Sequence, residues 1–192
     1  MKIIYRGGYN PNVEASIKKS FWYDYTSLIN KIVNSGEKVA VVTLAKPDGY
    51  YDQFIRQHAK GVDIINSRKT SINWGDYAAV FLPGGDSSIL YTELNNRGFA
   101  LNKLKNDALV LGDSAGAYVL SSYFYYSPVG ENRGKIIEFR EGFNKELNII
   151  TIAHTNNPIY TNDILIAKVE KFAGSKNLKI IRLAENEEKS FI

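Results

Sequence analysis

Ser114 has the sequence neighbours of a nucleophile. It lies in Gly112-Asp113-Ser114-Ala115-Gly116, after the apolar run of residues 108–111 and before a stretch of small residues. A Gly-x-Ser-x-Gly pattern between a buried strand and a helix is typical of a nucleophile elbow, a sharp turn with a serine at its tip. The following helix N-terminus would place N–H groups and a partial positive charge beside the serine oxygen. We therefore predict that Ser114 attacks a carbonyl carbon.

A serine hydroxyl needs a base to take its proton, and histidine is the usual one. The chain has two histidines. His58 falls near the end of a predicted helix, where a surface position or an interaction with the helix dipole is the simplest role. His154 directly follows the apolar run of residues 149–153, so it should emerge at the same edge of the sheet as Ser114. We predict that His154 is the base; the alternative is a loop histidine that begins the turn at residues 156–158.

A third group should hold the imidazole in one tautomer and stabilise its charged form. The acids between the serine and the histidine are Glu131, Glu138, Glu141 and Glu146. Glu131 lies in a loop that can fold back to the site, whereas Glu138 lies within a predicted strand. Glu131 is therefore the preferred acid.

A second glycine-rich turn, Pro83-Gly84-Gly85-Asp86, follows the predicted strand of residues 78–82. An oxyanion needs preorganised donors, and glycines let backbone N–H groups point at a ligand. We predict that the N–H groups of Gly85 and Ala115 form the oxyanion hole. A plainer role for the turn is entry into a helix with Asp86 as N-cap, and both roles are compatible. The residues expected to contact substrate are Gly84, Asp86 and Asp113.

Apolar runs alternate with amphipathic stretches along the whole chain. The predicted strands are residues 2–5, 38–44, 62–65, 78–82, 108–111, 136–139, 149–153 and 178–182. The predicted helices are residues 21–34, 52–60, 87–95, 99–105, 115–122 and 161–172, and a polar tail follows the last strand. Such alternation implies right-handed crossovers and a mostly parallel sheet with helices on both faces. We predict one three-layer, doubly wound α/β domain over residues 1–192.

Composition excludes several classes of protein. The 192 residues are 44% hydrophobic and 23% charged, as in one globular domain. The absence of cysteine excludes disulfides and thiolate chemistry. Dispersed basic residues with a net charge of +4 do not favour nucleic-acid binding. No apolar run is long enough to span a bilayer, and the start lacks a secretory pattern. We expect a cytoplasmic protein with no membrane, nucleic-acid, metal or cofactor partner.

Three segments together resemble the peptidase E family of serine peptidases. They are Leu82-Pro83-Gly84-Gly85-Asp86, Gly112-Asp113-Ser114-Ala115-Gly116-Ala117, and a late strand that ends at His154. The resemblance covers most of the chain. It implies a class I glutamine amidotransferase-like fold, shared with cyanophycinase-like relatives, and hydrolysis of dipeptides or aspartyl-containing peptides through an acyl-enzyme without a cofactor. By position, the family's nucleophile falls on Ser114, its histidine on His154 and its acid near Glu131.

The chain departs from this family's pattern in two places that bear on activity. Asp113 precedes the serine where an uncharged side chain is expected, and a carboxylate there would slow the reaction unless it points away or meets a substrate amine. Aspartyl dipeptidases also carry an arginine on the helix after the histidine, and residues 161–165 contain none. Specificity for an N-terminal aspartate is therefore not expected.

The sequence thus predicts a serine peptidase or amidohydrolase that cleaves small, dipeptide-like substrates. Two other interpretations stay open at this point. One is a small carboxylesterase of the α/β-hydrolase fold, whose order of serine, acid and histidine is the same. The other is an inactive family member that binds a partner. A homodimer is left open.

Overall fold

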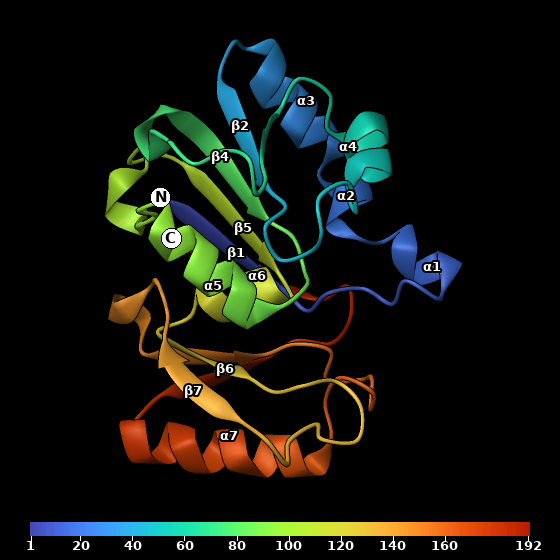
Figure 1. Ribbon diagram of the computed structural model, residues 1–192, viewed down its shortest axis with the longest axis vertical. Coiled ribbons are helices and arrows are strands. Elements are labelled where there is room, and N and C mark those ends of the chain that lie inside the picture. Colours follow the sequence, from blue (N-terminus) through green and yellow to red (C-terminus); the bar gives the residue numbers. More distant parts are fainter.

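The computed structural model describes residues 1–192 and contains two β-sheets (Figure 1). The first sheet has six strands in the order β10-β1-β5-β4-β2-β3. Strands β1 to β5 are parallel to their neighbours, and β10 pairs antiparallel with β1. Their bounds are β1 Lys2–Arg6, β2 Lys38–Val42, β3 Asp63–Ile65, β4 Tyr77–Leu82, β5 Leu109–Asp113 and β10 Glu188–Phe191. The central strands are apolar along their length because helices cover both faces.

The second sheet has four strands in the order β7-β6-β8-β9. Strands β6, β8 and β9 are parallel, and β7 pairs antiparallel with β6. Their bounds are β6 Tyr123–Tyr126, β7 Glu138–Glu141, β8 Ile149–Ile152 and β9 Lys179–Arg182. The predicted mostly parallel α/β fold with flavodoxin-like layers is confirmed. Its strands divide between two sheets, where one sheet was expected.

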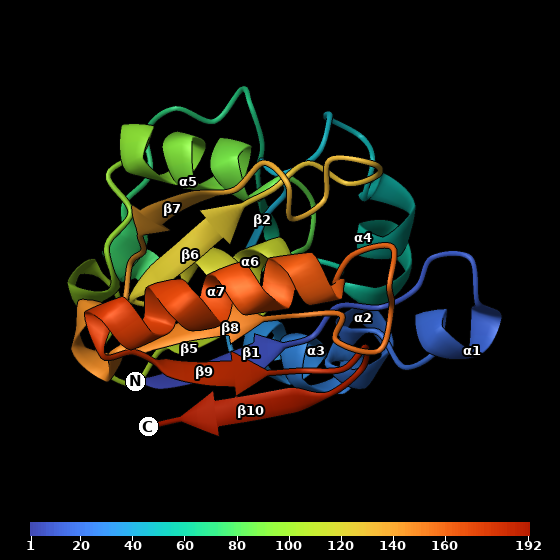
Figure 2. The same cartoon turned by 90° about the horizontal axis from the view of Figure 1, so that it is seen from below.

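Helices cover and separate the sheets (Figures 1 and 2). Helices α2, α3 and α4 bury Trp22, Ile29 and Ile55 against one face of the six-stranded sheet. Helix α6 lies between the sheets, in contact with β1, β4 and β5 of the first and with β6 and β8 of the second. Helix α7 covers the outer face of the second sheet. The helix bounds are α1 Glu14–Ile17, α2 Phe21–Asp24, α3 Thr26–Asn34, α4 Asp52–His58, α5 Ser87–Asn96, α6 Ala115–Val119 and α7 Asp163–Lys176.

Several segments differ from the sequence-based expectation, and the short helix α1 was not predicted at all. The helix expected over residues 21–34 is broken at Tyr25, and residues 99–105 form only a 3-10 turn, η2 Leu101–Lys103. The other two 3-10 turns are η1 Trp74–Asp76 and η3 Lys145–Leu147. The tyrosine-rich stretch is strand β6, and the polar tail forms strand β10. The sequence pattern did not predict strand β10 because an edge strand with an exposed face can be polar.

No helix has the combination of length and apolar content that crossing a membrane requires.

Candidate active site

Ser114 lies at the tip of the turn between β5 and α6, as the Gly-x-Ser-x-Gly pattern predicts. Its backbone angles are φ 50° and ψ −105°. A non-glycine residue rarely adopts a positive φ, and such strain is concentrated at functional sites. The Ser114 N–H donates to the Arg6 carbonyl oxygen at 3.0 Å, which ties the elbow to the end of β1.

Glycines on either side of Ser114 allow helix α6 to approach the sheet. A Cβ at Gly116 would lie 2.0 Å from the carbonyl oxygen of Leu82 on β4. A Cβ at Gly112 would lie 2.5 Å from the Gly116 carbonyl carbon. Any side chain at either position would therefore push the helix away from the strands. The two glycines place the N-terminus of α6 directly behind the serine.

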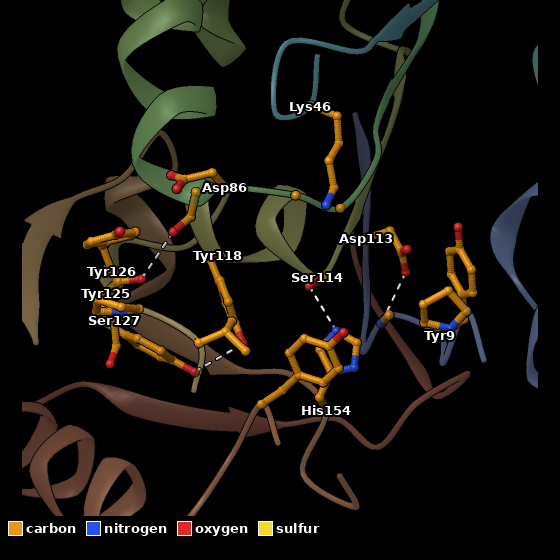
Figure 3. Close-up of a pocket in the computed structure, with 18 of the residues that line it drawn as sticks. Tyr9, Lys46, Asp86, Asp113, Ser114, Tyr118, Tyr125, Tyr126, Ser127 and His154 are labelled. Carbon is orange, nitrogen blue, oxygen red and sulfur yellow. Dashed lines mark hydrogen bonds between the residues drawn. The ribbon is translucent and has the colours of Figure 1, made fainter. Parts of the chain in front are cut away.

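His154 faces Ser114 across the pocket (Figure 3). The separation between His154 Nε2 and Ser114 Oγ is 3.0 Å, a hydrogen-bonding distance. His154 follows β8, has a φ of 56°, and donates its N–H to the Gly7 carbonyl oxygen at 3.0 Å. The ring of Tyr160 lies against the imidazole, with 4.5 Å between ring centroids. Ser114 and His154 are therefore brought together as expected.

The carboxylate on the far imidazole nitrogen belongs to Glu185. The distance from His154 Nδ1 to Glu185 Oε1 is 3.0 Å, and the Glu185 side chain is only 9% exposed. The same oxygen accepts a hydrogen bond from Asn157 Nδ2 at 2.8 Å. The Glu185 N–H donates to Asn156 Oδ1 at 2.8 Å. Two asparagines of the loop after His154 thus fix the position of the acid.

Glu131, the acid preferred from the sequence, is not part of this group. It is exposed in the loop between β6 and β7, with no hydrogen bond or ion pair from its side chain. The prediction considered only the acids between Ser114 and His154 in the chain, whereas Glu185 follows His154. Glu185 comes shortly after strand β9, so the rule that sites form at the carboxyl edge of parallel strands pointed to it as well.

The environment of His154 favours the neutral imidazole. Burial lowers its pKa, and the positive charge of Arg133 acts in the same direction. The hydrogen bond and the charge of Glu185 raise the pKa and oppose these effects. Because the net shift is downward from an ordinary value near 6.5, the ring is neutral at pH 7 and able to accept a proton from Ser114.

The turn after β4 lies close to Ser114. A Cβ at Gly84 would lie 3.4 Å from Ser114 Cβ. Gly85 has a φ of 141°, and a Cβ there would lie 2.3 Å from the Ala45 carbonyl oxygen. The N–H groups of Gly85 and Ala115 donate to no group within the protein. They are therefore free to bind an oxyanion.

Asp86 and Asp113 both line the pocket, but each carboxylate already has a backbone partner. Asp86 is the N-cap of α5, accepting from the N–H groups of Ser88 and Ile89. Asp113 accepts from the Gly8 N–H at 3.1 Å and points toward Tyr9, away from Ser114 (Figure 3). Burial raises the pKa of Asp113 to about 6, against the opposing effects of the Arg6 charge and the Gly8 hydrogen bond. The carboxylate is directed toward Gly8 and Tyr9 rather than toward Ser114 Oγ.

The pocket in front of Ser114 has a volume of about 230 Å³. Its walls carry several tyrosine rings and two cationic side chains, Lys46 and Arg133. The tyrosines of this wall are Tyr9, Tyr50, Tyr51, Tyr118, Tyr125, Tyr126 and Tyr160. The site therefore combines aromatic walls with charged side chains of both signs, since Asp86 and Asp113 also line it.

His58 does not take part in the site. Its ring packs against Tyr23, with 4.2 Å between centroids, and its Nδ1 lies 3.2 Å from Thr26 Oγ1. No three acidic or histidine side chains converge in a way that suits a metal ion.

Comparison of the chain with protein-family models and with curated proteins finds no match.

Proposed function

We propose that this protein is a serine peptidase or amidohydrolase that cleaves short peptides through an acyl-enzyme. The observation that carries the proposal is the continuous chain of hydrogen bonds from Ser114 Oγ through His154 to Glu185, each 3.0 Å long. A serine, a neutral histidine and a buried carboxylate in this order form the constellation of serine hydrolases on several unrelated folds. The resemblance to the peptidase E family supports the same assignment.

The reaction begins when His154 Nε2 takes the proton of Ser114 and the serine oxygen attacks the peptide carbonyl carbon. Glu185 stabilises the imidazolium that forms and keeps its Nδ1 proton in place. The N–H groups of Gly85 and Ala115 hold the oxyanion. His154 then gives its proton to the leaving nitrogen, the C–N bond breaks, and the amine departs.

The acyl group stays on Ser114 until water removes it. His154 takes a proton from the water, the hydroxide attacks the ester carbon, and the Ser114 oxygen leaves with the proton from the imidazolium. The products are a carboxylic acid and an amine. The step uses no oxidant, reductant or metal, and each proton is returned.

Two observations favour peptidase chemistry over the alternatives. The free N–H group of Gly85 supplies an oxyanion donor from the turn that precedes the elbow in the chain. A further helix and two strands follow His154, unlike an α/β-hydrolase esterase. The orientation of Asp113 toward Gly8 and Tyr9 weakens the objection that its charge opposes the oxyanion. An inactive binding protein is therefore the weaker proposal.

The test is covalent labelling of Ser114 by a fluorophosphonate together with hydrolysis of a dipeptide panel. Ser114→Ala should lose labelling and lower turnover by about 10⁴-fold or more, because no other group supplies the nucleophile. Ser35→Ala, an exposed serine at the end of α3, serves as a matched control and should keep both activities. Hydrolysis that survives Ser114→Ala, or labelling at another residue, would contradict the proposal.

A further inference from the structure

Arg133 is a buried cation without a counter-ion. The residue is only 7% exposed, yet its guanidinium forms no ion pair. The two other arginines with buried side chains are both neutralised: Arg6 pairs with Asp24 and Glu188, and Arg97 pairs with Glu93. A buried unpaired charge is costly, so its presence in a pocket points to an anion that binds there.

The guanidinium is held in place before any ligand arrives. Its Nε donates to the Tyr160 carbonyl oxygen and its Nη1 to the Ser127 carbonyl oxygen. The backbone is fixed as well, since the Arg133 carbonyl accepts from Asn162 Nδ2 at 3.0 Å. Its Nη2 donates to no protein group, and the residue lines the same pocket as Ser114. A fixed guanidinium with a free nitrogen suits a carboxylate.

Arg133 lies on the histidine side of the pocket. Tyr160, whose carbonyl oxygen binds Arg133, packs its ring against His154. The charge of Arg133 also acts directly on the titration of His154. His154 must reach the leaving nitrogen to protonate it, so the leaving part of the substrate lies on this same side. An anion held by Arg133 therefore belongs to the leaving part.

We propose that Arg133 binds the free C-terminal carboxylate of the amino acid that is released, so that the enzyme cleaves the last peptide bond of a short peptide. This inference rests on the proposed function and names its substrate class. In a peptide, the C-terminal carboxylate is separated from the last peptide nitrogen by a single Cα atom. A cation close to His154 can therefore bind this carboxylate. A substrate with a C-terminal amide would leave Arg133 without a counter-ion.

The experiment compares one dipeptide in two forms, with a free C-terminal carboxylate and with a C-terminal carboxamide. Wild-type protein should show a kcat/KM about 10- to 100-fold higher for the free acid, the range expected of a charge-assisted hydrogen bond. Arg133→Met should lower kcat/KM for the free acid by that factor and leave the amide within about threefold. Arg133→Lys keeps the charge but loses the planar guanidinium with its fixed donors. Its kcat/KM for the free acid should lie between the values of wild type and Arg133→Met.

Two controls separate binding from folding. Arg68→Ala removes an exposed arginine and should keep the preference for the free acid. The rate of fluorophosphonate labelling, which needs no carboxylate, shows whether Ser114 remains reactive in each variant. Removal of the Arg133 charge should also move the acid limb of the pH profile for the amide substrate to higher pH, because that charge lowers the pKa of His154.

Three outcomes would overturn the inference. An equal loss for both substrates in Arg133→Met would show that the arginine acts only on structure. Loss of the preference in Lys46→Ala, with Arg133→Met unchanged, would assign the carboxylate to Lys46. A preference for an acidic residue before the cleaved bond, lost in Arg133→Met, would place the anion on the acyl side.

A binding measurement keeps this test independent of catalysis. Calorimetry on the Ser114→Ala variant, with and without Arg133→Met, should give tighter binding of the free-acid dipeptide than of the amide only when Arg133 is present. If wild-type protein shows no labelling and no hydrolysis while this difference persists, the proposed function fails and the carboxylate site stands. If labelling is intact and the difference is absent, the carboxylate site alone fails.

Discussion

Ser114 and His154 share an uncommon backbone feature. Both have a positive φ, of 50° and 56°, which costs about 1–3 kcal/mol for a residue with a side chain. Both are held by the same short segment at the end of β1: Arg6 accepts from the Ser114 N–H, and Gly7 accepts from the His154 N–H. Gly8 then lies against the imidazole, where a Cβ would come within 2.3 Å of the ring. Residues 6–8 therefore set the distance between Ser114 and His154.

The identity of the acid is testable at the residue scale. Glu185→Gln should lower kcat by about 10²- to 10⁴-fold, because an amide cannot stabilise the imidazolium as a carboxylate does. Glu185 raises the pKa of His154, so its removal should also shift the acid limb of the kcat/KM profile to lower pH. The profile of each variant between pH 4 and pH 8 measures both effects.

Glu131→Gln is the matched control for this substitution. Its side chain is exposed and has no hydrogen-bond partner, so its activity should stay within about twofold of wild type. A large loss in Glu131→Gln with a small loss in Glu185→Gln would reverse the assignment of the acid.

At the scale of the elements, the site depends on how closely α6 packs against β4 and β5. The contact is made between backbones, through Gly112 and Gly116, so it has no tolerance for an added atom. Because α6 also contacts β6 and β8, a displacement of this short helix would disturb its packing against both sheets. The small residues of the elbow thus have a packing function besides exposing the serine.

Two glycine-to-alanine substitutions separate packing from helix propensity. Gly116→Ala should lower the free energy of unfolding by about 1–3 kcal/mol or more, since its Cβ would overlap the Leu82 carbonyl. Gly174 lies within α7, and apart from the backbone of the helix itself no atom would lie within 4 Å of an added Cβ. Gly174→Ala should therefore raise the free energy of unfolding by about 0.5–1 kcal/mol. Urea unfolding measures both, and equal effects at the two sites would contradict the packing argument.

At the scale of the whole molecule, the site exists only where the two sheets meet. Ser114 follows a strand of the first sheet, whereas His154 and Glu185 follow strands of the second. Helix α6 lies between the sheets, and the His154 N–H and Gly7 carbonyl join the two directly. The geometry of the proposed triad is therefore a property of the docking of the sheets rather than of either sheet alone.

The difference in stability between wild type and an Asp113 variant should depend on pH. Its pKa is about 6 in the folded protein and 3.8 as the ordinary value, so the folded state binds more protons between these values. The contribution of Asp113 to the free energy of unfolding should therefore fall as pH rises from about 4 to about 6, by at most about 3 kcal/mol, and stay level above that range. Acidification through the same window should restore this contribution.

Asp113→Asn removes this titration and keeps an oxygen for the Gly8 N–H. Its stability relative to wild type should therefore increase from pH 4 to pH 7. Urea unfolding of both proteins at pH 4, 5, 6 and 7 measures the difference. If the free energy of unfolding of wild type instead rose relative to that of Asp113→Asn as pH rises, the ionised carboxylate would be stabilised by a partner.

The sequence alone determined the layered α/β class, the elbow at Ser114 and the choice of His154. These features depend on local patterns: apolar runs of strand length, glycines at a fixed spacing, and a histidine directly after a strand. Only the tertiary structure decided what depends on distant pairing. It divided the strands between two sheets and brought Glu185, rather than Glu131, to the histidine. It also buried Arg133 without a counter-ion. Residues far apart in a chain meet only through the docking of the elements that carry them, and local spacing does not encode that docking.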